Sequence, residues 1–486
     1  MTVAELYRPP IRPDRPTTRE ALAEAVPGAR VTVVGGARSG LSVARLLARL
    51  GAGVFLSDHG AAEAGVAEGL ERAGVQSEFG GHTARALDAD WLVVSPGVPT
   101  TTNLVQSALR QRRPVYSEIE VASWFCRGPI VAVTGSNGKT TTTSLIGHLF
   151  ATAGRKHVVA GNIGYPLSDY VEDIDEETAV ILEVSSFQLD HVHTFRPHAA
   201  VLLNVTPDHL DRYDHDVEQY AAAKFRLFAN LQPADWLIYN HDDEAVREHA
   251  QSLAAERGLT PVAFSADAEP TPGAFVRDGS IVLALPAALG DGHPTPPVID
   301  HEDLMPTSDL ALPGRHNLYN SLAAAIVARA MEIRSDVVRE SLTSFEGVPH
   351  RLETVRTVGG VAFVNDSKAT NVNAVWYALE SFPGNVILIA GGRDKGNDYG
   401  PLQRLVADKV KGIVAIGEGA EAVERELGPY TEEVARAASM EEAIQYARLM
   451  AQPGDTVLLS PACASFDMFE NYEDRGDTFK RLVHAL

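Results

Sequence analysis

Short apolar runs alternate with amphipathic helical stretches along this chain, and no other feature of the sequence constrains the fold more. The first unit joins the run Arg30–Val34, the helical stretch Leu41–Ala48 and the run Val54–Leu56. Similar units begin with Ile130–Thr134 and Val361–Asn365. Strands that alternate with helices form parallel sheets covered by helices on both faces. The alternation therefore predicts an α/β protein with several such sheets.

The length of the chain predicts how many of these sheets to expect. At about 150 residues per domain, 486 residues correspond to three domains. We expect an N-terminal extension over residues 1–28 and a Rossmann-like domain over 29–126. A central P-loop ATPase-type domain with a parallel sheet follows over 127–348, and a second Rossmann-like domain over 349–486. Within the central domain, the Pro/Gly-rich passage Pro270–Pro297 indicates a surface excursion with a few weak strands.

Charge and composition exclude several classes of protein. Lys and Arg number 42 and Asp and Glu 64, so the net charge is 42 − 64 = −22, which argues against nucleic acid or an anionic membrane as partner. No run reaches the roughly 18 apolar residues of a membrane span, and Met1–Pro16 lacks the apolar core of a secretory signal, so it is interpreted as a loose extension. Two cysteines, Cys126 and Cys463, form no disulfide framework, which favours a reducing cytoplasm. We expect a cytoplasmic monomer without stable membrane association.

A glycine-rich turn between a strand and a helix predicts a phosphate-binding loop. The strand Val131–Thr134 is followed by Gly135-Ser-Asn-Gly-Lys-Thr140 and by a helical stretch from Thr141. Glycines let backbone N–H groups converge on phosphate oxygens at the positive end of a helix. In such loops the lysine reaches the β- and γ-phosphates and the hydroxyl residue binds Mg²⁺. The general spacing requires Gly at position 133, which is Val here, so a turn with a surface lysine is the alternative.

Two later strands deliver polar residues to the same expected edge of the sheet. Glu183 follows the run Ala179–Leu182, and His209 follows the strand that ends near Leu203. Ligands of open parallel sheets bind beyond the carboxyl ends of the strands, and carboxylates suit Mg²⁺. Lys224 lies among small and apolar residues, which would lower the pKa of its ammonium group. A filler histidine and a lysine that extends off an apolar face are the alternatives.

Motifs in every predicted domain resemble those of the Mur ligase family, the ATP-dependent amide ligases of peptidoglycan precursor synthesis. The motifs of the first two-thirds are Thr134-Gly-Ser-Asn-Gly-Lys-Thr-Thr141, Gly161-Asn-Ile-Gly164, Glu183-Val-Ser-Ser-Phe-Gln-Leu189, Asn204-Val-Thr-Pro-Asp-His-Leu-Asp-Arg212, Gly314-Arg-His-Asn-Leu-Tyr-Asn320 and Pro349-His-Arg351. The C-terminal motifs resemble the members that add D-glutamate: Asn365-Asp-Ser-Lys-Ala-Thr-Asn371, Gly391-Gly-Arg-Asp-Lys395 and Leu459-Ser-Pro-Ala-Cys-Ala-Ser-Phe-Asp467. The resemblance implies addition of D-glutamate to UDP-N-acetylmuramoyl-L-alanine through an acyl phosphate, with ATP giving ADP and phosphate.

The resemblance also implies roles for individual residues of this sequence. Lys139, Glu183, His209 and Lys224 match catalytic positions; Thr140 and Glu183 would bind one Mg²⁺, and His209 would share a second with Lys224 as a carbamate. Positions that match ATP-binding residues are Gly135, Ser136, Asn137, Gly138, Lys139, Thr140, Thr141, Asn317, Asn320, His350, Arg351 and Asp366. Positions that match the D-glutamate site are Lys368, Thr370, Lys395, Ser465 and Tyr472. Arg38, Ser39, Asp58 and Gly97 match the UDP-binding region, and Asn162 matches a position along the substrate.

Three other functions compete with this interpretation. A folylpolyglutamate synthase would share the phosphate loop but lack Ser460-Pro-Ala-Cys-Ala464, and an assay of several amino acids would distinguish it. A dinucleotide-dependent oxidoreductase, suggested by the Gly-rich turn before Asp58, would bind a nicotinamide cofactor. A nucleotide-binding switch would turn over ATP without the UDP substrate. Cys463 lies in the acceptor motif, but as a small buried residue it is expected to serve packing.

Overall fold

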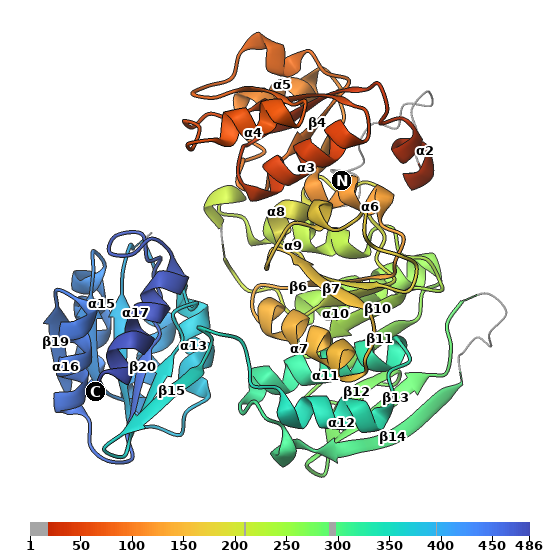
Figure 1. The fold of residues 1–486 in the computed structure, drawn as a ribbon. Helices are drawn as coiled ribbons and strands as arrows, with labels where there is room; N and C mark the ends of the chain where they lie inside the picture. The colour runs from red at the N-terminus through yellow and green to blue at the C-terminus, as the bar shows by residue number, and fades with distance from the viewer. Residues whose placement is uncertain (1–17, 209, 291–297, 395) are drawn as a thin grey trace. The chain divides into compact units, whose positions relative to one another are not determined.

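The described residues form three sheets, which Figure 1 shows in chain order from red to blue in a computed structural model. The structure describes residues 18–208, 210–290, 298–394 and 396–486. It divides into two compact units. The first unit comprises the residues up to Asp309 together with Tyr319–Thr343, and the second comprises Leu310–Leu318 with Ser344–Leu486. The first unit contains two sheets, and each unit is described by itself below.

The first sheet has five parallel strands in the order β3-β2-β1-β4-β5. Its strands are β1 (Arg30–Val34), β2 (Gly53–Ser57), β3 (Gln76–Glu78), β4 (Trp91–Val94) and β5 (Val115–Ser117), and its helices are α3 (Arg38–Arg49), α4 (Val66–Arg72), α5 (Asn103–Arg110) and α6 (Glu118–Phe125). The order reverses between β1 and β4, so the loops after these two strands flank the point where doubly wound sheets bind ligands.

Part of the expected N-terminal extension is folded. Helix α2 (Arg19–Glu24) begins after Thr18, whose side chain accepts a hydrogen bond from the Ala21 N–H. Leu22 and Val26 are buried in the hydrophobic core of the first sheet. The Arg19 guanidinium donates to the backbone carbonyl of Cys126. Residues 18–28 are therefore part of the first unit, whereas the interpretation of Met1–Pro16 as a loose extension lies outside the described residues.

The second sheet has nine strands in the order β14-β13-β12-β11-β10-β9-β6-β8-β7. The strands are β6 (Ile130–Thr134), β7 (His157–Gly161), β8 (Ala179–Glu183), β9 (Ala199–Leu202), β10 (Trp236–Asn240), β11 (Pro261–Ser265), β12 (Gly273–Arg277), β13 (Ser280–Pro286) and β14 (Ile299–Pro306). The main helices of this part are α7 (Lys139–Thr152), α8 (Ser186–Leu189), α9 (Val217–Phe225), α10 (Glu244–Arg257), α11 (Arg315–Ala330) and α12 (Ser335–Ser344). Strands β7 to β12 are parallel, and β12, β13 and β14 pair antiparallel.

Strands are present in Pro270–Pro297, as predicted. They belong to the central sheet, however, so the prediction of a surface excursion was wrong for them. Strands β12 and β13 extend the central sheet, and Phe275, Val282 and Leu283 are buried. The described prolines and glycines of this passage lie before, at the ends of or after the two strands, and Gly279 lies in the turn between them, so the composition alone does not reveal the strands. Residues 291–297 of the passage lie outside the described part of the chain.

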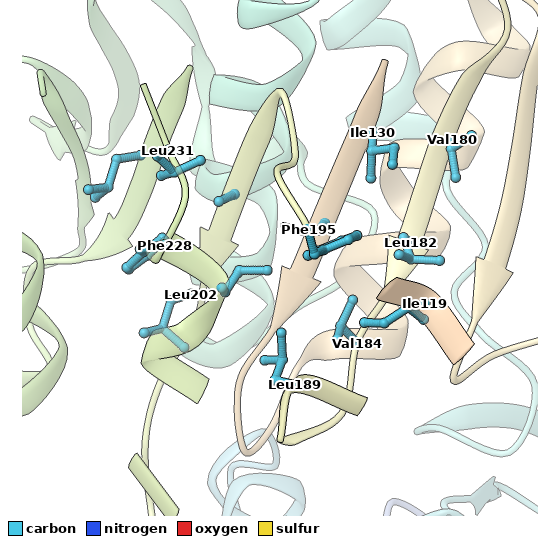
Figure 2. Close-up of a cluster of buried hydrophobic side chains, with 14 of the residues drawn as sticks. Ile119, Ile130, Val180, Leu182, Val184, Leu189, Phe195, Leu202, Phe228 and Leu231 are labelled. Carbon is cyan, nitrogen blue, oxygen red and sulfur yellow. The ribbon is translucent and has the colours of Figure 1, made fainter. Parts of the chain in front are cut away.

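A continuous hydrophobic core fixes the central strands of the second sheet. Every residue of β6 and β8 is buried, as expected for parallel strands covered on both faces. Figure 2 shows Leu182 and Leu202 from two of the strands with Phe195 between them. Because the strands are held by this core, the position at which each strand ends is well defined. The residues that follow those ends are therefore placed by a rigid scaffold.

The third sheet has six strands in the order β15-β16-β20-β17-β18-β19. The strands are β15 (Glu353–Val358), β16 (Val361–Asn365), β17 (Val386–Gly391), β18 (Val410–Ile416), β19 (Glu433–Ala437) and β20 (Thr456–Leu459), and the helices are α13 (Val372–Glu380), α14 (Gln403–Lys409), α15 (Ala420–Leu427), α16 (Met440–Met450) and α17 (Tyr472–His484). All pairs are parallel except β15 with β16. The predicted fold class, three α/β domains with parallel sheets, is confirmed. Among the described residues, no helix is both long and apolar enough to cross a membrane.

Candidate functional site

The predicted phosphate loop joins β6 to the N-terminus of α7. Gly138 caps this helix with a φ of 83°, a left-handed conformation that glycine adopts without strain. Asn204, just after β9, fixes the loop from one side. Its Oδ1 accepts from the Asn137 N–H at 2.8 Å, and its Nδ2 donates to the Asn137 carbonyl at 3.1 Å. The loop is thus held in one shape at a helix N-terminus, the arrangement that binds phosphate in other proteins.

Lys139 lies at the first position of α7 and turns back over the loop. Its Nζ donates to the carbonyls of Gly135 at 2.8 Å and Ser136 at 2.9 Å. The next residues, Thr140 and Thr141, are buried. The Thr141 hydroxyl has no hydrogen-bond partner among the described residues. The loop therefore brings together one ammonium group and a threonine oxygen that is free to accept a ligand contact.

Glu183 is the last residue of β8, next to the phosphate loop in the sheet. Its side chain is buried, and Oε1 accepts a hydrogen bond from Asn162 Nδ2 at 2.8 Å. Oε2 is buried and has no partner within the part of the chain that the structure describes. A buried carboxylate oxygen without a partner is costly. A hard cation is the partner that such an oxygen prefers.

Lys224 of α9 also contacts the phosphate loop. It is 1% exposed, and its Nζ donates to the Gly135 carbonyl at 2.9 Å and lies 4.6 Å from the centre of the Tyr220 ring. Burial lowers the pKa of Lys224 well below its ordinary value, and the charge of Lys139 lowers it further. The nearby carboxylate of Glu183 acts in the opposite direction. The structure thus gathers three of the four predicted catalytic residues around the loop.

The fourth predicted catalytic residue, His209, lies outside the described residues. Among those that are described, no three histidine, cysteine, aspartate or glutamate side chains gather as a metal site. The oxygen atoms around the loop that could bind a cation are the unpartnered Glu183 oxygen and the threonine hydroxyls of α7. Oxygen donors of this kind fit Mg²⁺.

The predicted UDP-binding residues gather where the order of the first sheet reverses. Asp58 follows β2, and its carboxylate accepts from the backbone N–H groups of Gly36 and Gly60. Arg38, at the start of α3, donates to the Gly164 carbonyl at 3.2 Å, close to Asn162 in the chain. Ser39 lies on the same turn of α3, and Gly97 is exposed in the loop after β4. All of these residues lie at carboxyl ends of parallel strands or directly beyond them.

In the second unit, three of the predicted nucleotide-binding residues lie close together. Asp366 follows β16 and is buried, and it accepts from Ser460 Oγ at 2.8 Å and the Leu352 N–H at 3.2 Å. Burial raises the pKa of Asp366 to about 7, and the charge of Arg351 opposes this shift. The adjacent His350 is buried and has a φ of 63°.

The two predicted asparagines lie about one turn apart on α11. Asn317, of the second unit, donates from Nδ2 to the Pro313 carbonyl at 2.8 Å. Asn320, of the first unit, accepts from Thr142 Oγ1 at 3.1 Å. A Cβ on Gly138 would lie 2.5 Å from Asn320 Oδ1. Asn320 therefore lies against the phosphate loop.

Four of the predicted acceptor residues, Lys368, Thr370, Ser465 and Tyr472, follow β16 or β20. The Lys368 ammonium lies 5.3 Å from the centre of the Tyr472 ring. Ser465 is buried, and Thr370 is exposed. Lys395 lies outside the described residues, so its predicted role stays a prediction.

Arg475 belongs to none of the motifs recognised in the sequence. It is 1% exposed, and it donates to Ser367 Oγ at 2.9 Å, to the Ser367 carbonyl at 2.8 Å and to the Cys463 carbonyl at 3.1 Å. It therefore joins the loops after β16 and β20, which carry the two acceptor motifs. The signal was its helical spacing with Phe479 and Val483, which places all three on the buried face of α17.

Cys463 does not have the surroundings of a nucleophile. Burial raises the pKa of its thiol to about 11, and its Sγ lies 3.2 Å from the Tyr399 hydroxyl. A thiol that stays protonated is a poor nucleophile. Its surroundings agree with the predicted packing role.

Comparisons with known proteins give the same family in all three parts of the chain. Family models match residues 29–117 (Mur ligase MurD-like, N-terminal domain), 133–328 (Mur ligase middle domain) and 350–463 (Mur ligase, glutamate ligase domain). The chain is 61% identical to the UDP-N-acetylmuramoylalanine–D-glutamate ligase of Salinibacter ruber, over 94% of this chain and 98% of the relative. It is 44% identical to the ligase of the same name from Chloroherpeton thalassium, over 95% and 99%.

Solved structures share the fold at low sequence identity. A pseudomurein peptide ligase type C from Methanothermus fervidus has a TM-score of 0.56 at 19% identity and covers 94% of this chain and 100% of its own. The MurF ligase from Thermotoga maritima, in complex with ADP, has a TM-score of 0.55 at 18% identity and covers 89% and 95%. The family models match parts of all three sheets, and relatives of full length align with nearly the whole chain. This chain belongs to the Mur ligase family.

Proposed function

We propose that this chain adds D-glutamate to UDP-N-acetylmuramoyl-L-alanine at the expense of ATP, giving ADP and phosphate, in peptidoglycan precursor synthesis. The observation that carries the proposal is the 61% identity with a relative of that name over 98% of the relative's length. The organisation of the phosphate loop supports the ATP-dependent step. Because such precursors are made in the cytoplasm, we place the enzyme there, as a monomer that binds small molecules only.

In the first step, an oxygen of the alanyl carboxylate attacks the γ-phosphorus of ATP, and ADP leaves. The product is an acyl phosphate, which has a far better leaving group than a carboxylate. Lys139, the loop glycines Gly135 and Gly138 and the backbone N–H groups at the N-terminus of α7 are proposed to hold the phosphates and offset their charge, whereas the N–H groups of Ser136 and Asn137 donate to Asn204. Preorganised groups of this kind typically contribute about 10²–10³ in rate each.

We propose that two Mg²⁺ ions bind around this loop, where they would offset charge on the transferring phosphoryl group. Thr140 and Glu183 would hold one ion, and His209 and Lys224 the other. We propose that Lys224 reacts with CO₂: its neutral amine forms an N–C bond and releases one proton, which leaves an anionic carbamate. Burial favours the neutral amine, because the ammonium form is poorly solvated there.

In the second step, the amine of D-glutamate attacks the acyl carbon, and phosphate leaves through a tetrahedral intermediate. Lys368 and Lys395 are proposed to pair with the two carboxylates of D-glutamate. The further proposed contacts of this substrate are Thr370, Ser465 and Tyr472. We assign no general base, since no described side chain is tied to the incoming amine.

The remaining proposed contacts lie in both units. Arg38, Ser39, Asp58, Gly97 and Asn162 of the first unit are proposed to bind the UDP-linked substrate. In the same unit, Ser136, Asn137, Thr141 and Asn320 are proposed to bind ATP. In the second unit, Asn317, Arg351 and Asp366 are proposed to bind the nucleotide.

The test is phosphate release by the purified enzyme with ATP, UDP-N-acetylmuramoyl-L-alanine and D-glutamate. We expect release only when all three are present, and little release when L-glutamate replaces D-glutamate. Equal rates with the two enantiomers would refute the substrate assignment. Release of phosphate without the UDP substrate would favour a different ATPase function.

Lys224→Ala tests the carbamate. We expect this variant to lose most activity and to recover part of it when a short carboxylate is added. Lys156→Ala is the matched control, because Lys156 is 60% exposed and pairs with Asp175 at the surface; it should keep full activity. Full activity of Lys224→Ala would refute the carbamate.

A further inference from the structure

Arg212 connects two loops of the first unit that lie far apart in the sequence. It is the last residue of the 3₁₀ turn Leu210–Arg212. Its Nη1 donates to the Pro96 carbonyl and its Nη2 to the Val98 carbonyl, both at 2.7 Å. The two carbonyls lie on either side of Gly97, in the loop after β4. One planar guanidinium therefore holds this loop at two points.

The same guanidinium is fixed from a second direction by an aromatic ring. It lies 4.0 Å from the centre of the Phe187 ring. Phe187 belongs to α8, four residues after Glu183, and its ring stacks on Tyr213 with centres 6.2 Å apart and planes at 23°. A cation over an aromatic face is attracted to it, and the contact fixes the plane of the guanidinium.

From Tyr213 the packed side chains continue to the phosphate loop. Tyr213 is buried, and its ring centre lies 5.5 Å from that of Tyr220. The Tyr220 hydroxyl lies 3.1 Å from Ser136 Oγ in the phosphate loop. The Tyr220 ring also faces the Lys224 ammonium group. A continuous series of contacts thus joins the loop after β4 to the groups around the phosphates.

We propose that Arg212 is a positioning residue that sets the loop around Gly97, and with it the UDP-linked substrate, relative to the phosphate loop. The proposal rests on the proposed function, because it assigns the Gly97 loop to that substrate. Attack on the γ-phosphorus requires the alanyl carboxylate to lie at a defined distance from ATP. A displacement of about 1 Å at such a distance can cost about 10²-fold in rate. Arg212 touches neither reacting group in this scheme and acts through the loop.

Lysine cannot replace arginine in this role. A guanidinium donates in two parallel directions and stacks flat on a ring, whereas an ammonium is a point charge on a flexible stem. Arg212→Lys keeps the positive charge but loses the paired contacts with Pro96 and Val98. We therefore expect the loop to shift while the charge of the region is preserved.

The experiment is the phosphate-release assay with Arg212→Lys, varying one substrate at a time. We expect kcat/KM for UDP-N-acetylmuramoyl-L-alanine to fall about 10- to 100-fold, with KM for ATP within about twofold of the wild type. Phe187→Leu removes the ring contact and should shift the same parameter in the same direction. Methylguanidinium should restore part of the activity of Arg212→Ala, and methylamine should not.

Arg155→Lys is the matched control. Arg155 also donates to a backbone carbonyl, that of Met331, and lies 5.5 Å from the centre of a phenylalanine ring, Phe150. It follows the end of α7 that is remote from the phosphate loop. Loss of an arginine that serves only local packing is therefore expected to leave all kinetic parameters unchanged.

The possible outcomes separate the positioning role from the proposed function. Wild-type kinetic parameters in Arg212→Lys would overturn the positioning role, as would equal rises in KM for ATP and for the UDP substrate. If kcat/KM for the UDP substrate fell equally in Arg155→Lys, the positioning role would also be overturned, because general destabilisation would then explain both losses. Failure of the wild type itself to release phosphate would refute the proposed function, and the positioning role with it.

Discussion

Glu118 provides a test of the electrostatics of the first unit, because this carboxyl group is buried at the start of α6. It is 0% exposed, its Oε1 accepts from the Ser168 N–H at 2.7 Å, and its Oε2 has no partner among the described residues. Burial raises the pKa of Glu118 to about 7, and the neighbouring Asp169 carboxylate adds to the shift. The hydrogen bond from Ser168 opposes it.

This shift makes the stability of the first unit depend on pH. The difference between about 7 in the fold and an ordinary 4.5 is about 2.5 pKa units, or about 3 kcal/mol at 1.36 kcal/mol per unit. Because the folded pKa is the higher one, the unfolded chain releases its proton first as pH rises. The fold therefore favours the protonated form of Glu118. The contribution of this preference to the free energy of unfolding is fully present below pH 4.5 and is lost between about pH 4.5 and 7.

Glu118→Gln removes this dependence and keeps the shape of the side chain. The amide oxygen can still accept from the Ser168 N–H, and the group stays neutral at every pH. We expect the free energies of unfolding of the variant and the wild type to be similar near pH 4.5. At pH 8 the variant should be more stable by up to about 3 kcal/mol.

Urea unfolding at a series of pH values measures the effect. Trp124 lies on α6 itself and contacts Trp91, with ring centres 5.7 Å apart, so tryptophan fluorescence reports on this region. The midpoint multiplied by the slope gives the free energy of unfolding at each pH. Parallel pH curves for Glu118→Gln and the wild type would refute the reasoning.

Glu120→Gln is the control on the same helix. Glu120 is also buried, but both of its oxygens are used: Oε1 accepts from Trp124 Nε1 and from Thr194, and Oε2 accepts from the N–H groups of His193 and Phe195. An amide NH₂ cannot accept hydrogen bonds, so this change should destabilise the protein at every pH. Above pH 7, Glu118→Gln should therefore raise the free energy of unfolding and Glu120→Gln should lower it.

Three further changes test the site. Lys139→Met should lower the rate of phosphate release about 10²- to 10³-fold while binding of the UDP substrate, measured by calorimetry, stays unchanged; wild-type turnover would contradict the assignment. Gly138→Ala places a Cβ 2.5 Å from Asn320 Oδ1 at a φ of 83°, and the strain of at least about 1 kcal/mol should weaken ATP binding measured by equilibrium titration. Arg475→Met leaves the carbonyls of Ser367 and Cys463 without their donor, so it should cost about 3 kcal/mol of stability and raise KM for D-glutamate in the kinetic assay.

Much of the fold and part of the candidate site could be predicted from local patterns. The strand before Gly135, the turn and the helix from Lys139 follow from residues that are adjacent in the sequence, and the structure has them in that order. Glu183 was placed by the rule that polar residues after parallel strands meet at one edge. The predicted roles of His209 and Lys395 stay predictions, because both residues lie outside the described part of the chain.

Other features could not be predicted, because they depend on contacts between distant residues. Arg212 meets Pro96 and Val98 more than a hundred residues away. Glu118 accepts a hydrogen bond from the N–H of Ser168, fifty residues later in the chain. No local pattern distinguishes these side chains from arginines and glutamates at the surface, since burial arises only when the elements pack.

The sequence by itself therefore determined the three α/β sheets, the strand, turn and helix of the predicted phosphate loop, and the family, since periodicity and motif spacing are local properties of the chain. The tertiary structure decided which side chains lose their water. It buried Lys224 against Gly135 and left one oxygen of Glu183 without a partner. It also joined the loops after β16 and β20, which carry the predicted acceptor motifs, through Arg475. The physical reason is that the cost of burying a charge, and the partner that offsets it, depend on the surroundings that only the packed fold provides.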